Sequence, residues 1–107
     1  MIKRKLLVAP QAMTATANPL YTVAGGLSAQ IMGCTIHNPT AAPITVKINY
    51  VNQAGAADAT NEMLSKTLQE GESYPCPELV NHTLTAGMSF QGLGDGAVIV
   101  VSGVTFT

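Results

Sequence analysis

The side chains best suited to chemistry are scattered along this 107-residue chain rather than grouped. The six carboxylates fall in stretches rich in glycine, proline and small polar residues: Asp58, Glu62, Glu70, Glu72, Glu78 and Asp95. Hydrolysis of a glycoside needs two carboxyl groups held across a cleft, and no pattern here fixes such a pair. We therefore expect these six carboxylates to be solvated loop residues. The alternative, a calcium ion among Asp58, Asn61 and Glu62, matches no calcium-loop spacing.

The histidines and cysteines also lack the spacing of a reactive site. His37, His82, Cys34 and Cys76 form no Cys-x-x-Cys or His-x-x-x-His motif, and no local motif supports a Cys/His nucleophile pair. Two cysteines are too few for a disulfide scaffold. We expect two free thiols, Cys34 in the core and Cys76 in a loop, with a disulfide between them as the alternative.

The glycine-rich stretch GLGDG at residues 92–96 resembles a phosphate-binding loop only superficially. It lacks the Lys-Ser/Thr pair and the helix that such a loop needs, so we expect a hairpin turn. The sequence therefore predicts neither an enzyme nor a bound cofactor or metal.

Charge is sparse and concentrated at the start of the chain. Charged residues make up 10% of the sequence, where about 25% is usual, so we expect a surface of small neutral groups that is inexpensive to desolvate. Lys3, Arg4 and Lys5 are three of the five basic residues. The net charge of −1 provides no general attraction for nucleic acid. The basic cluster is expected to be a solubilising edge strand, and the alternative is a flexible basic arm that contacts nucleic acid or an acidic partner surface.

The stretch at residues 30–51 is the most strongly patterned element, and the others must assemble around it. Apolar residues alternate with polar ones in its second half, as in a half-buried strand: Ile44, Val46, Ile48 and Tyr50. In its first half we expect Met32, Cys34 and Ile36 on one face, and Ile31, Gly33, Thr35 and His37 on the other. Two prolines predict a loop at residues 38–43 and hence a hairpin.

Short strands separated by turn residues account for the rest of the chain. We expect them at residues 3–10, 20–23, 63–68, 79–85, 88–92 and 97–107, with a long loop at 52–61 and an extended connection at 73–78. Residues 98–101 are apolar on both faces, so we expect the last strand to be central or covered on both sides, with a break at Gly103. About eight short strands without a helix predict one all-β domain over residues 1–107, an antiparallel β-sandwich or jelly roll. Residues 1–10 are alternatively an extended N-terminal arm. Their apolar run is too short for a signal peptide, so we expect a protein made in a cytoplasm.

Several of these segments resemble small tailed-phage virion proteins. QIMGCTIHNPT at residues 30–40, followed by ITVKI at 44–48, is similar to a hairpin of that family, with Cys34, Ile36, Asn38 and Thr40 at its alternating positions. LTAGMSF at 84–90 resembles the family's turn before a strand, with Met88 in place of an acidic residue, and VIVVSGVTF at 98–106 resembles its closing strand. The resemblance implies a β-sandwich that decorates (cements) a capsid or belongs to the neck or tail, with no catalytic residue.

The resulting hypothesis is a structural protein of a bacteriophage virion, made in the host cytoplasm and bound to the outer capsid surface as a homo-oligomer. Its expected partners are the major capsid protein or other virion proteins, with no membrane and no nucleic acid. A neck or tail component is the first alternative. A carbohydrate- or host-surface-binding module is the second, disfavoured because the chain has no Trp and only three Tyr. The residues expected to contact partners are Lys3, Arg4, Lys5, Asn52, Gln53, Asp58 and Asn61.

Overall fold

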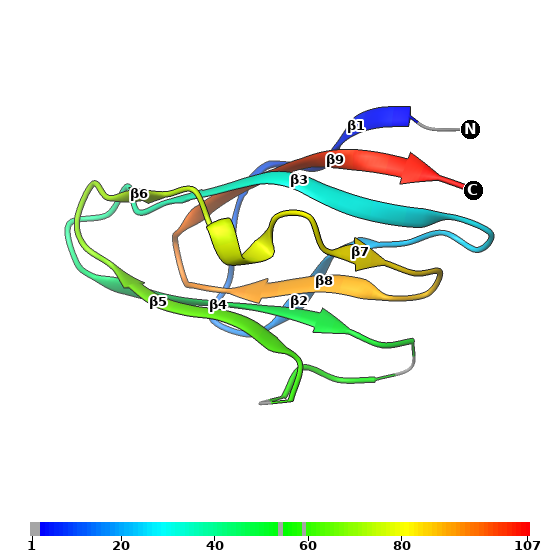
Figure 1. The fold of residues 1–107 in the computed structure, drawn as a ribbon. Coiled ribbons are helices and arrows are strands. Elements are labelled where there is room, and N and C mark those ends of the chain that lie inside the picture. Colours follow the sequence, from blue (N-terminus) through cyan, green and yellow to red (C-terminus); the bar gives the residue numbers. More distant parts are fainter. Residues whose placement is uncertain (1–2, 54, 59) are drawn as a thin grey trace.

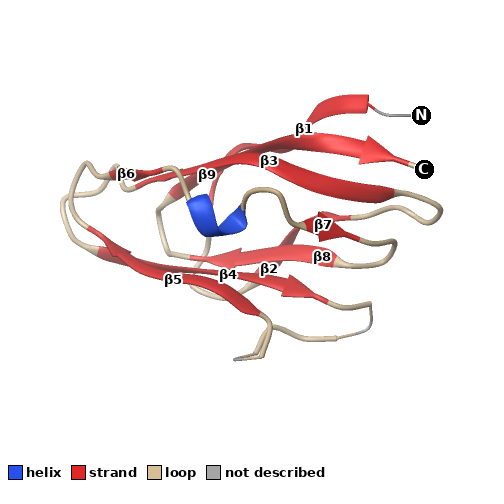
Figure 2. Cartoon of the chain, viewed as in Figure 1, coloured by secondary structure: helices blue, strands red, loops and turns tan. Residues whose placement is uncertain are grey.

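Strands dominate the chain, as its alternating residues predict, and they form two antiparallel sheets packed face to face (Figures 1 and 2). The structure is a computed structural model that describes residues 3–53, 55–58 and 60–107. The elements are β1 (Lys3–Ala12), β2 (Asn18–Thr22), β3 (Ser28–His37), β4 (Ile44–Val51), β5 (Glu62–Leu68), β6 (Ser73–Tyr74), the 3₁₀ turn η1 (Pro77–Leu79), β7 (Thr83–Leu84), β8 (Ser89–Leu93) and β9 (Val98–Phe106). The predicted all-β sandwich is confirmed.

The strand order follows from folding one long hairpin around the 52–61 loop. β4 pairs with β5, β3 with β6 and β7, β2 with β8, and β1 with β9. The hairpin then rolls up, so that β9 also pairs with β3 and β8 with β4. The sheets are β1-β9-β3-β6, with β7 also on β3, and β2-β8-β4-β5. These nested pairs are the topology of a jelly roll.

The predicted hairpin at residues 30–51 is wrong in its pairing. β3 lies in the five-stranded sheet and β4 in the four-stranded sheet, so the 38–43 loop carries the chain from one layer to the other. Buried Asn38 holds this crossing: its amide nitrogen donates to the carbonyl oxygens of Ala42 (2.8 Å) and Leu68 (3.1 Å). Its Oδ1 accepts from the backbone N–H and hydroxyl of Thr40. The apolar faces of the two arms therefore meet across the core rather than within one sheet.

The face assignment is right for β4 and wrong for the first half of β3. Val46, Ile48 and Tyr50 are buried, and Ile44 is half-buried. In β3 the register shifts between Ile31 and Gly33, so Met32 is a bulge residue. Ile31 is consequently buried and Met32 is 51% exposed, the reverse of the expectation. A bulge inserts one residue and so moves the following side chains to the other face.

A second bulge lies on the opposite side of β9. The β1–β9 register shifts between Leu6 and Val8, at the level where β3 also shifts. β9 itself runs without a break through Gly103, which therefore does not interrupt its own strand as expected. The predicted central position of β9 is confirmed, because it lies between β1 and β3.

The strand predicted at residues 79–85 is mostly absent, and so is the extended connection at 73–78. Pro77 begins the 3₁₀ turn η1, and Cys76 before it has a φ of 51°. Asn81, with a φ of 68°, turns the chain again, a conformation that Asn tolerates better than most residues. Only β6 and β7 remain as short strands along the outer edge of β3.

The N-terminal segment is an edge strand. β1 pairs with β9 from Lys3 to Ala12, two residues beyond the expected end at Pro10. Leu7 and Val8 are buried in the core. The described residues 3–10 are therefore extended and paired with the sheet.

Replacing Ile48 with alanine is expected to lower the free energy of unfolding by about 2–5 kcal/mol, the range for emptying a packed aliphatic site. Ile48 is fully buried in β4, between Leu64 of β5 and Gly92 of β8. Urea melts measure the loss. Thr45→Ala on the same strand, where Thr45 is exposed and its hydroxyl contacts that of Thr67 at 3.0 Å, should change stability by about 1 kcal/mol or less. Equal effects of the two variants would contradict the assigned core face.

Candidate functional site

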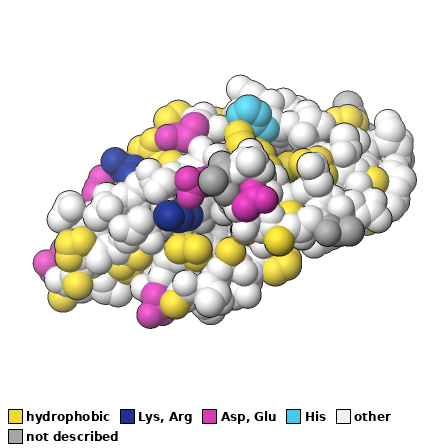
Figure 3. Space-filling view, turned by 90° about the horizontal axis from the view of Figure 1, so that it is seen from below, with side chains coloured by type: hydrophobic (Ala, Val, Ile, Leu, Met, Phe, Trp, Pro, Cys, Tyr) yellow, Lys and Arg dark blue, Asp and Glu magenta, His cyan; other side chains and the backbone are white. Residues whose placement is uncertain are grey.

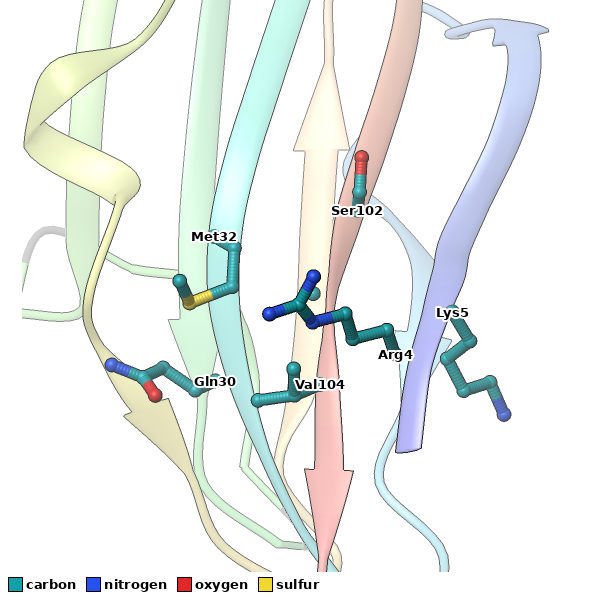
Figure 4. Close-up of a pocket in the computed structure, with 7 residues that line it drawn as sticks. Arg4, Lys5, Gln30, Met32, Ser102 and Val104 are labelled. Carbon is teal, nitrogen blue, oxygen red and sulfur yellow. The ribbon is translucent and has the colours of Figure 1, made fainter. Parts of the chain in front are cut away.

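The basic cluster lies on the exposed edge strand of the five-stranded sheet. Lys3, Arg4 and Lys5 are exposed and pair with Thr105, Val104 and Gly103 of β9, respectively. Because side chains alternate along a strand, Arg4 projects from the outer face and Lys5 from the opposite side. Figure 4 shows Arg4 reaching over β9 toward Met32 and Lys5 pointing away from it.

A hollow of about 700 Å³ lies on this outer face. It is lined by Arg4, Lys5, Gln30, Met32, Ser102, Gly103 and Val104 (Figure 4). The two bulges explain it, because they flank β9 where its side chains are smallest, at Ser102 and Gly103. Two of the predicted contact residues, Arg4 and Lys5, therefore belong to one depression together with an exposed apolar side chain.

An apolar band extends from this hollow along the outer face of the sheet. Four β9 side chains alternate with the buried residues Ile99 and Val101 and are half-buried: Val98, Val100, Val104 and Phe106. Leu6 and Met32, on the neighbouring strands, are each 51% exposed. We call these six residues the outer apolar band. Among the described residues, none of the six belongs to the hydrophobic core between the sheets.

The long loop is held by hydrogen bonds to the other sheet. The amide nitrogen of Asn49, on β4, donates to the carbonyl oxygen of Asp58 (3.0 Å) and to Oδ1 of Asn61 (2.8 Å). Asn61 in turn accepts from the backbone N–H of Asp58 and donates to the carbonyl oxygen of Ala56. Asn49 is buried although it was expected on an exposed face. The described part of the loop is thus organised within the monomer. Residues 54 and 59 lie outside the description.

The predicted contact residues of this loop are accessible. Asn52, Gln53 and Asp58 are exposed and Asn61 is half-buried. The hydroxyl and backbone N–H of Thr60 donate to Asp58 Oδ1 at 2.6 and 2.8 Å, and these bonds lower the pKa of that carboxyl. Asp58 is therefore a fully ionised surface group at neutral pH.

A smaller hollow of about 330 Å³ lies beside this loop. It is lined by Ala17, Lys47, Asn49, Ala57, Asp58, Glu62 and Leu93. Lys47 and Glu62 form an ion pair with 3.8 Å between Nζ and Oε1, and exposed pairs of this kind contribute little to stability. Figure 3, which views the molecule from the side of the four-stranded sheet, shows acidic and basic groups scattered over a mostly neutral face.

The predicted contact residues therefore form two separate sets on different sheets. Of the first set, Arg4 and Lys5 line the hollow beside the outer apolar band, and of the loop residues Asp58 lines the hollow of the four-stranded sheet. Sequence reasoning missed the band itself, although the run Val98–Val101, apolar on both faces, was its signal. One face of that run is needed for the core, and the other is left on the surface.

The arrangement offers little to a catalytic or metal-binding interpretation. Within residues 3–53, 55–58 and 60–107, no three His, Cys, Asp or Glu side chains gather as metal ligands would. His37 contacts Ser73, with 2.7 Å between Nδ1 and Oγ. His82 lies in a turn instead of the predicted strand and packs edge-on against Tyr50. No helix in the described part is long and apolar enough to cross a membrane.

Comparison with known proteins adds no neighbour to this geometry. No protein-family model, curated protein or solved structure matches the chain significantly. The outer apolar band and its basic border are consequently the features on which a functional interpretation has to rest.

Proposed function

We propose that this protein is a structural component of a bacteriophage particle, a capsid decoration (cement) protein that binds the outer capsid surface and stabilises it. The resemblance of residues 30–40, 44–48, 84–90 and 98–106 to small tailed-phage virion proteins supports the proposal. The jelly roll agrees with it by analogy, since viral capsid domains use this architecture. Because a fold does not by itself imply a function, the surface carries more weight.

The observation that carries the proposal is the outer apolar band. β9 is apolar on both faces, but the four-stranded sheet covers only the inner one. Val98, Val100, Val104 and Phe106 therefore form an apolar row that is interrupted by Ser102, with Leu6 and Met32 on the strands beside it. Apolar patches of this kind, rimmed by polar residues, mark interaction sites on soluble proteins.

The border of the band suits attachment to a large symmetric surface. Arg4, which reaches over β9 toward Met32, provides positive charge that can orient docking, and the surrounding neutral side chains cost little to desolvate. A specific interface needs about 1,600 Å² in total. A homo-oligomer with several such faces gains further through effective concentration, so that modest single contacts add up to durable attachment across capsomer boundaries.

The direct test is to look for the protein in particles. Cells carrying the gene in its native phage genome should release particles that contain the protein in many copies, and a cryo-EM map should place it on the outer capsid with β9 facing the shell. Density at the neck or tail would replace the decoration role with the first alternative. Particles without the protein would overturn the proposal.

Met32→Asp is expected to weaken binding to particles by about tenfold or more, because it puts a charge in the middle of an apolar contact. Met32 is 51% exposed on a bulge, so its urea midpoint should stay close to that of the unchanged protein. Thr45→Asp adds the same charge to the exposed face of the four-stranded sheet and should bind normally. Co-sedimentation with undecorated particles measures both variants. Equal binding would remove the band from the attachment surface.

A further inference from the structure

The two cysteines lie just beyond the same strand pair. β6 pairs with β3 through Ile36–Tyr74 and His37–Ser73. Cys34 lies two residues before Ile36 and Cys76 two residues after Tyr74, so the antiparallel chains bring the two cysteines together, although Cys76 itself lies past the end of β6. Opposed residues within such a pair have Cα atoms about 4.5–5.5 Å apart, and a disulfide spans up to about 6.8 Å.

Both side chains turn into the core at this point. Cys34 is 4% exposed and Cys76 is fully buried, although Cys76 lies in the turn between Pro75 and Pro77. The expectation that Cys76 is a loop thiol is thus right for the backbone and incomplete for the side chain. Both are free thiols, as the sequence predicts. Interaction with the neighbouring Cys76 thiol, together with burial, raises the pKa of the Cys34 thiol.

The segment that carries Cys76 is built from short elements, which backbone hydrogen bonds between Ile31 and residues 81–82 help to hold against β3. β6 and β7 have two residues each, and η1 between them has three. Cys76 itself has a left-handed φ of 51°, a conformation that costs free energy for a residue other than glycine. Short elements with few backbone bonds open at lower free energy than the centre of a sheet. Such opening exposes Cys76 while β3 stays paired with β9.

We propose that Cys34 and Cys76 are an oxidation site at which a small-molecule disulfide, such as oxidised glutathione, joins β3 to the η1 segment. When the segment opens, the Cys76 thiolate attacks one glutathione sulfur, and the first glutathione leaves as a thiolate. The Cys34 thiolate then attacks the Cys76 sulfur of the mixed disulfide and displaces the second glutathione. The protein loses two electrons and two protons, and one glutathione disulfide becomes two thiols.

The consequence is a cross-link that the chain acquires after it leaves a reducing compartment. Disulfides persist in oxidising surroundings and are rare where thiols are kept reduced. The bond closes a loop that contains β4, β5 and two of the crossings between the sheets, so it restricts the unfolded chain over a long segment. It also fixes the one segment of the five-stranded sheet held by short strands. This inference concerns the sandwich itself and does not depend on the proposed phage role.

The test incubates the reduced protein with oxidised glutathione and then alkylates it in denaturant. Intact mass should fall by two hydrogen atoms, with no alkyl group and no glutathione retained, and peptide mapping should recover residues 34 and 76 in one cross-linked fragment. The melting temperature of the oxidised protein should rise by about 10 °C or more. Sub-denaturing urea should speed the reaction, because the opening step limits it.

Two single variants separate the internal bond from other outcomes. Cys34→Ala should stop at one glutathione adduct on Cys76, and Cys76→Ala should react more slowly because Cys34 lies on a strand paired with β9. Two alkylated cysteines in the native protein after long exposure, stable adducts on both thiols, or a disulfide-linked dimer would each overturn the proposal. The peptide map of the unsubstituted protein decides the question even if a variant fails to fold.

Discussion

Replacing Gly103 with alanine is expected to lower the free energy of unfolding by about 3 kcal/mol or more. Gly103 is buried in β9 between the two bulges. A Cβ at this position would collide with the backbone carbonyl oxygen of Gln30 and come within 2.9 Å of Leu7 Cδ1. The Leu7 side chain can rotate, but the Gln30 carbonyl belongs to the β3–β9 ladder and can move only if that pairing breaks.

Gly33→Ala is the matched control, because Gly33 lies in β3 beside the same bulge. A Cβ there would meet no heavy atom within 4 Å, so we expect a change within about 1 kcal/mol, with a small gain from the stiffer unfolded chain. Urea or thermal melts of both variants provide the comparison. If Gly103→Ala is as stable as Gly33→Ala, the close approach of β3 to β9 at Gln30 is not present in solution.

Replacing Asn38 with aspartate is expected to cost about 3–5 kcal/mol at neutral pH. The amide group of Asn38 is fully buried and donates to two carbonyl oxygens, those of Ala42 and Leu68. A carboxylate has no hydrogen to donate, so both carbonyls lose their partner and face a negative charge. This amide holds the 38–43 loop to the end of β5, so the lost hydrogen bonds are those that connect the two sheets at this point.

The pH dependence distinguishes this mechanism from a general packing defect. Burial beside two carbonyl oxygens raises the pKa of the introduced carboxyl above its value in the unfolded chain. The loss in free energy of unfolding is therefore largest above the pKa of this carboxyl in the folded protein. The loss becomes smaller as the pH falls through that pKa, because the protonated acid again donates one hydrogen bond. Urea melts should show a smaller difference in unfolding free energy between the variant and the unsubstituted protein in mildly acidic buffer than in neutral buffer. Asn52→Asp, at an exposed loop position, should differ little from the unsubstituted protein in unfolding free energy, and this difference should not become smaller at acidic pH.

The elements of the fold were predictable from local pattern, but the crossing at Asn38 was not. The alternation in β4 identifies its core face directly, and glycine turns mark the ends of most other strands. Two apolar strands joined by a short proline-containing loop have the same sequence pattern whether the strands pair within one sheet or lie in different sheets. The difference lies in Asn38, whose amide is satisfied by Leu68, 30 residues away, and no local pattern carries that information.

The candidate surface was predictable only in part, for a similar reason. Charge density identifies Arg4 and Lys5 as surface residues near one end of the sheet. Met32 was expected on the core face because period two was extended through the β3 bulge, and adjacent apolar residues at 31 and 32 give no sign of the slip. The dual apolar character of β9 did indicate a covered strand. It could not indicate that the cover on the outer face is missing from the monomer.

The place of β9 between β1 and β3 has a consequence for the order in which the protein can be made. Synthesis proceeds from the N-terminus, so both neighbours emerge from the ribosome long before residues 98–106 exist. Until then, the five-stranded sheet lacks β9, and the edges of β1 and β3 that pair with it have no hydrogen-bonding partner strand. The five-stranded sheet can form completely only after residues 98–106 have left the ribosome. Its contacts with β1 join residues that are far apart in the sequence, and folding that depends on such contacts is slow. During that interval the unpaired edges of β1 and β3 are open to pairing with other chains.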